Sequence, residues 1–357
     1  MAVPRKRLAA IIAVIVVLTV VISVLMLPAT QGWLRDMLNG QTDPGQNGTT
    51  KSLHLVYSKE LTINTNGGTI INATTNLPLA VNVASNGLTM QQVISVTRTP
   101  QPTAIYDRNG SAFMRWDIGK MEGGSQTITV RYEVTQSQAE WNVDASTSGS
   151  IAQIPTSLKA RYLNDEWKIS FTSAEVTQLS QQLTAGKTDV FSKLKAIYDW
   201  MVDNVSYSAL GTGDPKSALE TLQSKVGDCD DQSILFCSLA RAAGVPAWLQ
   251  LGSLFNSDSN TLGGHGWVQA YIPLATGGGY NVTIDVVNRD FLKWTPIHVL
   301  DYTDTGSADD LRDYYHHIFL VYYDPSTYSG GNAPSMSSTV NVIAPRDPGL
   351  IKRNKNG

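Results

Sequence analysis

The stretch GDCDDQSILFCSLARAAGVPA, residues 227–247, decides the fold of the second half of this chain. Its apolar residues recur at helical spacing, and the run ends in Gly244-Val-Pro, which combines two helix-stop residues. Asp228 can act as N-cap, and Asp231 can accept further backbone N–H groups in the first turn. The stretch therefore predicts a helix that begins at Cys229 and ends before Gly244.

Cys229 would lie in the first turn of this helix, where unpaired N–H groups and the positive end of the helix dipole favour a thiolate. Asp228, Asp230 and Asp231 act in the opposite direction, because nearby negative charge raises the pKa of a thiol. We expect these aspartates to cap the helix, and a Ca²⁺ site is the alternative. Cys237 lies among apolar side chains in mid-helix and is expected in the core. A helical rise of 1.5 Å per residue separates the two cysteines by about 12 Å, so they cannot form a disulfide.

Two later segments supply a histidine and a carboxylate. His265 opens a predicted strand over 266–272 and has a glycine on each side, so that a substrate can approach the ring closely. Asp285 lies in an apolar strand predicted over 280–287, where an unpaired carboxylate would be costly to bury. A carboxylate on one imidazole nitrogen leaves the other nitrogen free to take a thiol proton. The sequence thus predicts a catalytic triad of Cys229, His265 and Asp285.

The segment 227–247 resembles the signature of the transglutaminase-like superfamily, in which the nucleophilic cysteine opens a helix ending in Arg-x-x-Gly-[Ile/Val]-Pro-Ala. His265 with the following Gly-Trp-Val resembles the second motif of that family, and Asp285 keeps the Cys, His, Asp order. The resemblance covers roughly residues 154–325. It implies a papain-like core and acyl transfer from amides through a thioester at Cys229. His265 would then be the base and later the acid, Asp285 would orient it, and the Cys229 N–H would be part of an oxyanion hole.

Neither a metal nor an organic cofactor is predicted. His316 and His317 are adjacent in sequence and lack the spacing of a metal-binding pair, so we expect them to be structural. The formal net charge is -3, and no Lys/Arg stripe runs along the chain, so nucleic acid is not an expected partner.

Residues Leu8 to Leu27 form an apolar run of 20 residues. As a helix, this run would span the hydrocarbon core of about 30 Å. Positive charge at 5–7 should hold the N-terminus in the cytoplasm and place the bulk of the chain outside the cell. The alternative is a cleaved signal peptide, but signal h-regions are shorter. The sequence therefore predicts a single-pass anchor in the cell membrane.

The predicted organisation has five parts. Residues 1–28 would be the transmembrane anchor, 29–51 a linker, 52–145 a β-sandwich (Ig-like) domain, 150–328 the transglutaminase-like domain and 329–357 a C-terminal tail. The sandwich prediction depends on turn signals between β-prone runs and on the alternation of apolar and polar residues over 127–134. It also resembles the companion domain of exported archaeal and bacterial family members. The predicted fold class is α+β with an N-terminal transmembrane helix.

Helix signals in the second half include a capping-box spacing from Thr172 to Glu175 and an apolar stripe from Phe191 to Val205. Asp214-Pro215 predicts the start of a short helix that Gly227 ends, and a strand is predicted over 247–254.

Together these patterns predict a membrane-anchored extracytoplasmic cysteine enzyme. Its partner would be a protein or peptide substrate outside the cell. The resemblance implies that amide bonds of this substrate react through a thioester acyl-enzyme, and hydrolysis is favoured over amine transfer. The alternative is a non-catalytic surface scaffold that uses the transglutaminase-like fold to bind partners.

Overall fold

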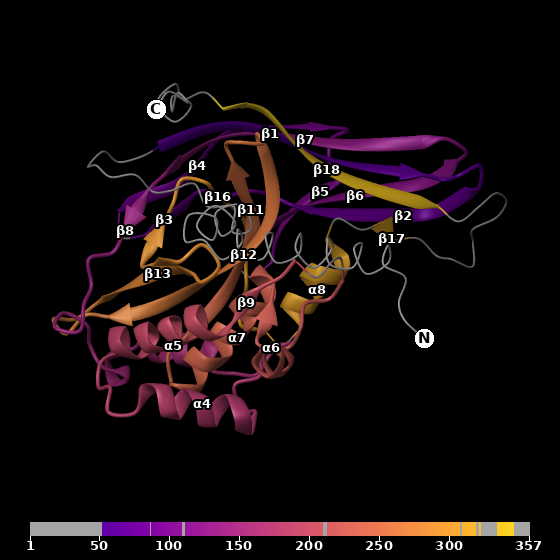
Figure 1. Ribbon diagram of the computed structural model, residues 1–357. Helices are drawn as coiled ribbons and strands as arrows, with labels where there is room; N and C mark the ends of the chain where they lie inside the picture. The colour runs from indigo at the N-terminus through magenta and orange to yellow at the C-terminus, as the bar shows by residue number, and fades with distance from the viewer. Residues whose placement is uncertain are drawn as a thin grey trace, which may run out of the picture. The chain divides into compact units, whose positions relative to one another are not determined.

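The computed structural model of this protein describes residues 52–85, 87–108, 111–209, 213–307, 309–318, 321–322 and 334–345, and these belong to one compact unit. Two antiparallel sheets, built mainly from the first half of the chain, share a core (Figure 1). The first sheet has the order β18 (Ser335–Pro345), β1 (Ser52–Asn64), β7 (Ser125–Ser137), β4 (Leu88–Thr99), β3 (Val83–Ser85). The second has the order β17 (Val321–Tyr322), β2 (Thr69–Pro78), β6 (Ser111–Glu122), β5 (Ala104–Arg108).

The core between these sheets follows from the alternation within the strands. Ile128, Val130, Tyr132 and Val134 of β7 are all fully buried, as the alternating sequence predicts. Tyr132 stacks on Tyr57 of β1 with 5.0 Å between the ring centroids. Burying one large apolar side chain stabilises a fold by roughly 1.5–3 kcal/mol, so this inner face is a principal source of stability.

Strand β18 lies far along the chain from its neighbour in the sheet. It pairs antiparallel with β1, from Asn64 opposite Ser335 to Leu55 opposite Pro345. The sequence places these residues in a C-terminal tail over 329–357, whereas the structure makes them an edge strand. Ser and Thr are frequent in the segment SMSSTVNVIAP, so its pairing with β1 determines its conformation more than its own pattern does.

A third antiparallel sheet forms the centre of the second half. Its order is β14 (Asp290–Phe291), β13 (Gly279–Asp285), β12 (Thr261–Pro273), β11 (Ala247–Asn256), β16 (His298–Thr303). Short two-stranded pairs join β9 (Ser206–Tyr207) to β10 (Val226–Gly227) and β8 (Ala139–Glu140) to β15 (Lys293–Trp294). The strands of the third sheet that position the site therefore span the predicted strands at 247–254, 266–272 and most of 280–287.

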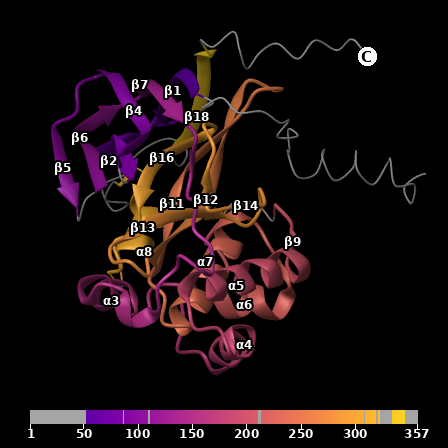
Figure 2. The same ribbon diagram turned by 90° about the vertical axis from the view of Figure 1, so that its left-hand side faces the viewer.

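Helices cluster on one side of this sheet (Figures 1 and 2). They are the 3-10 turn η1 (Ile151–Gln153), α3 (Thr156–Tyr162), α4 (Ala174–Thr184), α5 (Val190–Asn204), α6 (Ala218–Ser224), α7 (Cys229–Ala242) and, after the sheet, α8 (Asp310–His317). Helix α7 packs against β11 and β12 on one side and against α4, α5 and α6 on the other. Its central position explains why its residues from 231 to 241 are all buried.

The predicted helix signals have mixed outcomes. The start of α7 at Cys229 and the apolar stripe of α5 are confirmed. Helix α4 begins after Ser173, but no side-chain cap bond forms there. The predicted start of α6 at Asp214-Pro215 is wrong, because the hydroxyl of Ser217 accepts the Glu220 N–H and the Glu220 carboxylate accepts the Ser217 N–H. The helix ends before Gly227, at Lys225, which has φ 55°.

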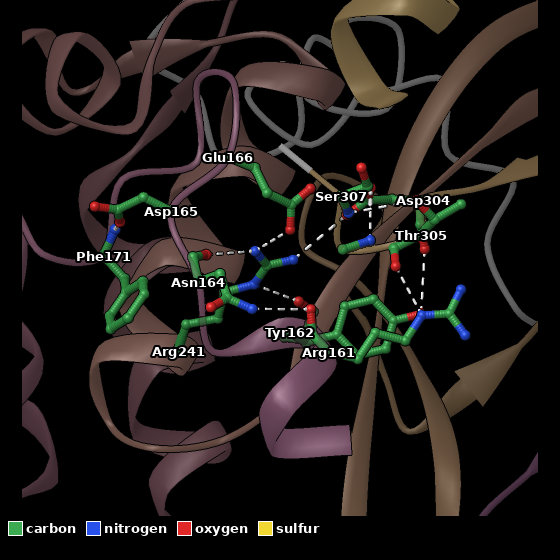
Figure 3. A network of polar contacts seen from close by, with 12 residues as sticks. Arg161, Tyr162, Asn164, Asp165, Glu166, Phe171, Arg241, Asp304, Thr305 and Ser307 are labelled. Carbon is green, nitrogen blue, oxygen red and sulfur yellow. Dashed lines mark hydrogen bonds and ion pairs between the residues drawn. The ribbon is translucent and has the colours of Figure 1, made fainter. Parts of the chain in front are cut away.

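Arg241 ties the end of α7 to loops from other parts of the chain (Figure 3). Its Nη1 donates to the Asn164 carbonyl at 3.0 Å and contacts the Glu166 carboxylate, and its Nη2 lies 3.4 Å from Asp304 Oδ2. Its Nε donates to the Ala247 carbonyl at 2.7 Å. Burial, and then repulsion by Asp304, raise the pKa of Glu166 to about 8, and burial also raises the pKa of Asp304. The two buried carboxyls therefore retain a proton beside a single guanidinium.

A buried ion pair joins β1 to β16. Lys59 Nζ contacts Asp301 Oδ2, and each side chain is 3% exposed. The ammonium group also lies 5.9 Å from the ring centroid of Tyr57 and 5.8 Å from that of Tyr132. Desolvation makes such a pair costly unless both partners are present, so it fixes how β16 meets the first sheet.

The predicted fold class requires a correction. The described residues are mostly strands, and none of their helices is long and apolar enough to span a bilayer. An α+β protein with a transmembrane helix is therefore not the fold observed. Strands predominate because the long strands β1, β4, β6 and β7, together with β18, outweigh the short helices. The apolar run from Leu8 to Leu27 lies outside the described residues.

Candidate active site

Cys229 is the first residue of α7, directly after the N-cap Asp228. The Asp228 carboxylate accepts the Asp231 N–H at 3.2 Å, and the Asp231 carboxylate accepts the Asp228 N–H at 3.3 Å. Asp231 also accepts the Lys216 N–H at 2.6 Å. These bonds confirm the predicted capping role of Asp228 and Asp231. Cys229 and Cys237 are both free thiols, and Cys237 is fully buried, as predicted.

Gly266 brings β12 against the nucleophile. Its backbone hydrogen bond to the Cys229 sulfur lowers the pKa of that thiol, which identifies the Gly266 N–H as the donor. Its carbonyl accepts the Ser233 hydroxyl at 3.2 Å. A Cβ at this position would lie 2.3 Å from Asp230 Oδ1, so any other residue would have to displace the Asp230 carboxylate from this close approach of β12 to α7. Because Gly266 directly follows His265, this contact places the thiol beside the imidazole-bearing end of β12.

The surroundings of Cys229 disfavour a resting thiolate. Burial raises the pKa of the thiol well above its ordinary value, and the negative charge of Asp230 raises it further. Asp228 and Asp285 act in the same direction, while the Gly266 N–H opposes them. The stabilisation of a thiolate that the helix dipole suggests is therefore outweighed. A neutral thiol that loses its proton as it attacks fits this environment better than a preformed thiolate.

Asp230 links the nucleophile to helix α8. Its Oδ1 lies 3.6 Å from the Cys229 sulfur, and its Oδ2 accepts the Tyr315 hydroxyl at 2.5 Å. Burial raises the pKa of the Asp230 carboxyl, and the Tyr315 hydrogen bond opposes that effect. All three aspartates of the 228–231 segment thus have partners within the protein, which favours structural roles over a Ca²⁺ site.

His265 and Asp285 are in direct contact. His265 Nε2 lies 2.8 Å from Asp285 Oδ2, and both residues are buried, at 8% and 1% exposure. Burial alone would raise the pKa of Asp285, but attraction and hydrogen bonds from His265 and His298 outweigh it and hold the pKa well below its usual range. Asp285 is therefore an ionised acceptor, and His265 Nε2 must carry the proton of this bond. The Nδ1 atom of His265 remains as the basic position of the ring.

Two residues absent from the predicted triad also bind Asp285. Asn288 donates its side-chain amide to Oδ2 at 2.7 Å and its backbone N–H to Oδ1 at 3.1 Å. His298, at the start of β16, lies with Nε2 at 3.1 Å from the same Oδ2. The tight turn after β13 could have suggested Asn288, but no local pattern marks His298, because tertiary packing alone brings it to Asp285.

Within the described residues, one group of side chains lies close enough together to hold a metal ion. It consists of His265, Asp285 and His298, whose possible ligand atoms all lie within 4.8 Å of one another. Each of these atoms is already used in a hydrogen bond between the three side chains. We therefore interpret the group as a hydrogen-bonded chain of the site. His316 lies elsewhere, 2.9 Å from Asp214 Oδ1, in an exposed pair.

Comparison with known proteins identifies the central region. Residues 177–284 match the model of the transglutaminase-like superfamily. A crystal structure of a candidate cysteine protease from Cytophaga hutchinsonii aligns with a TM-score of 0.54 and 19% identity, covering 82% of this chain and 92% of that one. This likeness shows a shared fold.

Two further structures align less closely. The periplasmic domain of TgpA from Pseudomonas aeruginosa has a TM-score of 0.35 and 13% identity, over 68% of this chain and 95% of that one. LapG from Legionella pneumophila has a TM-score of 0.28 and 19% identity, over 39% and 86%. No curated protein matches this sequence.

Proposed function

Since residues 177–284 form a transglutaminase-like domain, we propose that this protein is a cysteine enzyme that opens amide bonds of peptides or proteins with Cys229, His265 and Asp285. The observation that carries the proposal is the hydrogen bond between His265 Nε2 and Asp285 Oδ2. Gly266, the residue after His265, makes a backbone hydrogen bond to the Cys229 sulfur. This arrangement leaves His265 Nδ1 as the base for a thiol that rests in its protonated form.

The proposed reaction begins with transfer of the Cys229 thiol proton to His265 Nδ1 as the sulfur attacks the amide carbonyl carbon. The backbone N–H of Cys229, at the N-terminus of α7, would donate to the developing oxyanion. His265 then gives its proton to the leaving amine, which departs and leaves a thioester on Cys229. Asp285 stays ionised and stabilises the imidazolium that forms in between.

Water completes the cycle in the proposed hydrolysis. His265 takes a proton from a water molecule, whose oxygen attacks the thioester carbonyl, and Cys229 leaves with the proton from His265. We favour hydrolysis over amine transfer because water needs no binding site of its own.

The test uses the full chain and a peptide library read by mass spectrometry, with a dansyl-labelled alkylamine present in a parallel set. We expect amide cleavage, an acyl-enzyme mass on Cys229 after acid quench, and a loss of roughly 10⁴-fold or more in Cys229→Ala and His265→Ala. Cys237→Ala is the matched control, because that thiol is fully buried in the middle of α7. Cleavage that persists in Cys229→Ala would contradict the proposal, and amine incorporation in place of cleavage would correct its last step.

The raised pKa of Cys229 favours one other candidate function, a binding protein that keeps the fold without turnover. In that case the wild-type chain would bind library peptides without cleaving them, and Cys229→Ala would bind them equally well.

A further inference from the structure

The carboxylate of Asp285 serves two imidazoles at once. Its Oδ2 lies 2.8 Å from His265 Nε2 and 3.1 Å from His298 Nε2. An ionised carboxylate can only accept hydrogen bonds, so both Nε2 atoms carry protons. In each neutral ring the basic atom is then Nδ1. The ring centroids are 6.2 Å apart, so the two histidines meet through Asp285 and do not stack on each other.

His298 is held as firmly as a residue of the core. It is fully buried, and its ring lies 4.8 Å from Trp267 and 5.2 Å from Trp294 between centroids. Its Nδ1 lies 2.8 Å from the Thr295 hydroxyl and 3.2 Å from the Thr295 carbonyl. A neutral ring can accept from the hydroxyl, and a protonated ring can donate to the carbonyl. Thr295 therefore supports His298 in either charge state.

The sharing of Asp285 Oδ2 by two imidazoles has a direct consequence for His265, the proposed base. A carboxylate stabilises an imidazolium through its negative charge, and every additional donor on the same oxygen reduces the charge available to the first. With His298 in place, Asp285 is fixed against His265 but attracts a proton to that ring less strongly.

We propose that His298 is a positioning residue of the site, which holds Asp285 against His265 and shares the negative charge of that carboxylate. This inference rests on the proposed function for its catalytic meaning. It concerns a residue that contacts no reacting atom and acts only through Asp285.

Other ionisable groups also face the hydrogen-bonded group of His265, Asp285 and His298. A test must leave these other groups unchanged. They are Cys229 and Asp230 of α7, Tyr198 of α5, Asp290 of β14, and Arg289 and Lys293 beside that strand. The variants below leave all of them in place.

The experiment compares His298→Leu, which removes the donor, with His298→Gln, which keeps an N–H donor in a side chain of similar size. The full chain is labelled with ¹³C at histidine Cε1, the His265 signal is assigned with His265→Gln, and its titration is followed by NMR. We expect the midpoint of His265 to move up by about 0.5–1 pH unit in His298→Leu and to stay at the wild-type value in His298→Gln. The pH at which alkylation of Cys229 by iodoacetamide reaches half its maximal rate should move in the same way.

A folded His298→Leu chain with an unchanged or lower midpoint would overturn the proposal. Circular dichroism melting shows whether that variant folds. If it does not fold, Thr295→Val decides, because it removes only the hydroxyl beside Nδ1 at a half-buried position. A smaller upward shift of the His265 midpoint in Thr295→Val supports the proposal. An unchanged midpoint in that variant overturns it. The NMR titration needs no turnover, so it distinguishes failure of this inference from failure of the proposed hydrolysis.

Discussion

Replacing Glu166 by Gln should remove a pH dependence of stability that a buried carboxyl imposes. The Glu166 side chain is 0% exposed and shares Arg241 with Asp304. Burial, and then Asp304, raise its pKa from the ordinary 4.5 to about 8. The folded chain therefore keeps a proton that the unfolded chain releases. The contribution of Glu166 to the free energy of unfolding is fully present below pH 4.5. It is lost as the pH rises towards 8.

The magnitude follows from the linkage between protonation and folding. Each unit of pKa difference corresponds to 1.4 kcal/mol, so the loss across this window is roughly 5 kcal/mol. Gln cannot ionise, and its amide can still accept from Arg241 and donate to Asp304. We therefore expect similar free energies of unfolding for wild type and Glu166→Gln near pH 5, and a clearly more stable variant at pH 8.

The assay is urea unfolding at pH 5, 6.5 and 8, followed by tryptophan fluorescence. Asp290 has a pKa raised to about 6, mainly by burial, and gives the wild type a similar trend at lower pH. This contribution cancels in the difference between the two proteins. Glu175→Gln, at an exposed position of α4, is the matched control, and its stability should run parallel to that of the wild type. Parallel curves for Glu166→Gln and wild type from pH 5 to 8 would refute the reasoning.

Three further perturbations test other parts of the structure. Asp230→Asn should lower the pKa of Cys229 and accelerate its alkylation by iodoacetamide at pH 8, because it removes a negative charge 3.6 Å from the sulfur. The asparagine side chain still offers an acceptor to the Tyr315 hydroxyl. An unchanged or slower rate of alkylation contradicts this prediction. Asp301→Leu should cost about 3–5 kcal/mol in urea unfolding because it removes the carboxylate that the buried Lys59 ammonium contacts. Adding Lys59→Met should recover part of that loss, and equal stability of the single and double variants argues against it. Ser217→Ala should cost about 1 kcal/mol through loss of the capping box of α6, and a wild-type melting curve would show that the cap contributes nothing.

Local patterns in the sequence were sufficient for much of the site. The start of α7, its caps and the free thiols follow from residues within a few positions of Cys229. The pairing of His265 with Asp285 followed from the cost of burying a lone carboxylate in a strand. These inferences succeeded because each depends on interactions that are short in sequence or obligatory in chemistry.

The remaining features depend on contacts between distant segments. His298 carries no motif, and only the pairing of β16 with β11 brings it to Asp285. The sequence indicated that the neighbouring aspartates raise the pKa of Cys229. The larger effect, burial by the surrounding elements, depends on tertiary packing and could not be read from it. At α6 several residues could have capped the helix, and the reciprocal bonds of Ser217 determine the choice.

The pairing of β18 with β1 also sets the order in which the first sheet can fold during synthesis. β7, the other partner of β1, ends at Ser137, and β18 begins at Ser335, about 200 residues later. At ~5–20 residues per second, a ribosome needs roughly 10–40 s to make that interval. During this time the outer edge of β1 has unpaired N–H and C=O groups that other nascent chains could join. Completing the first sheet therefore awaits translation of the whole transglutaminase-like domain, and a chaperone that shields β1 would act in that interval.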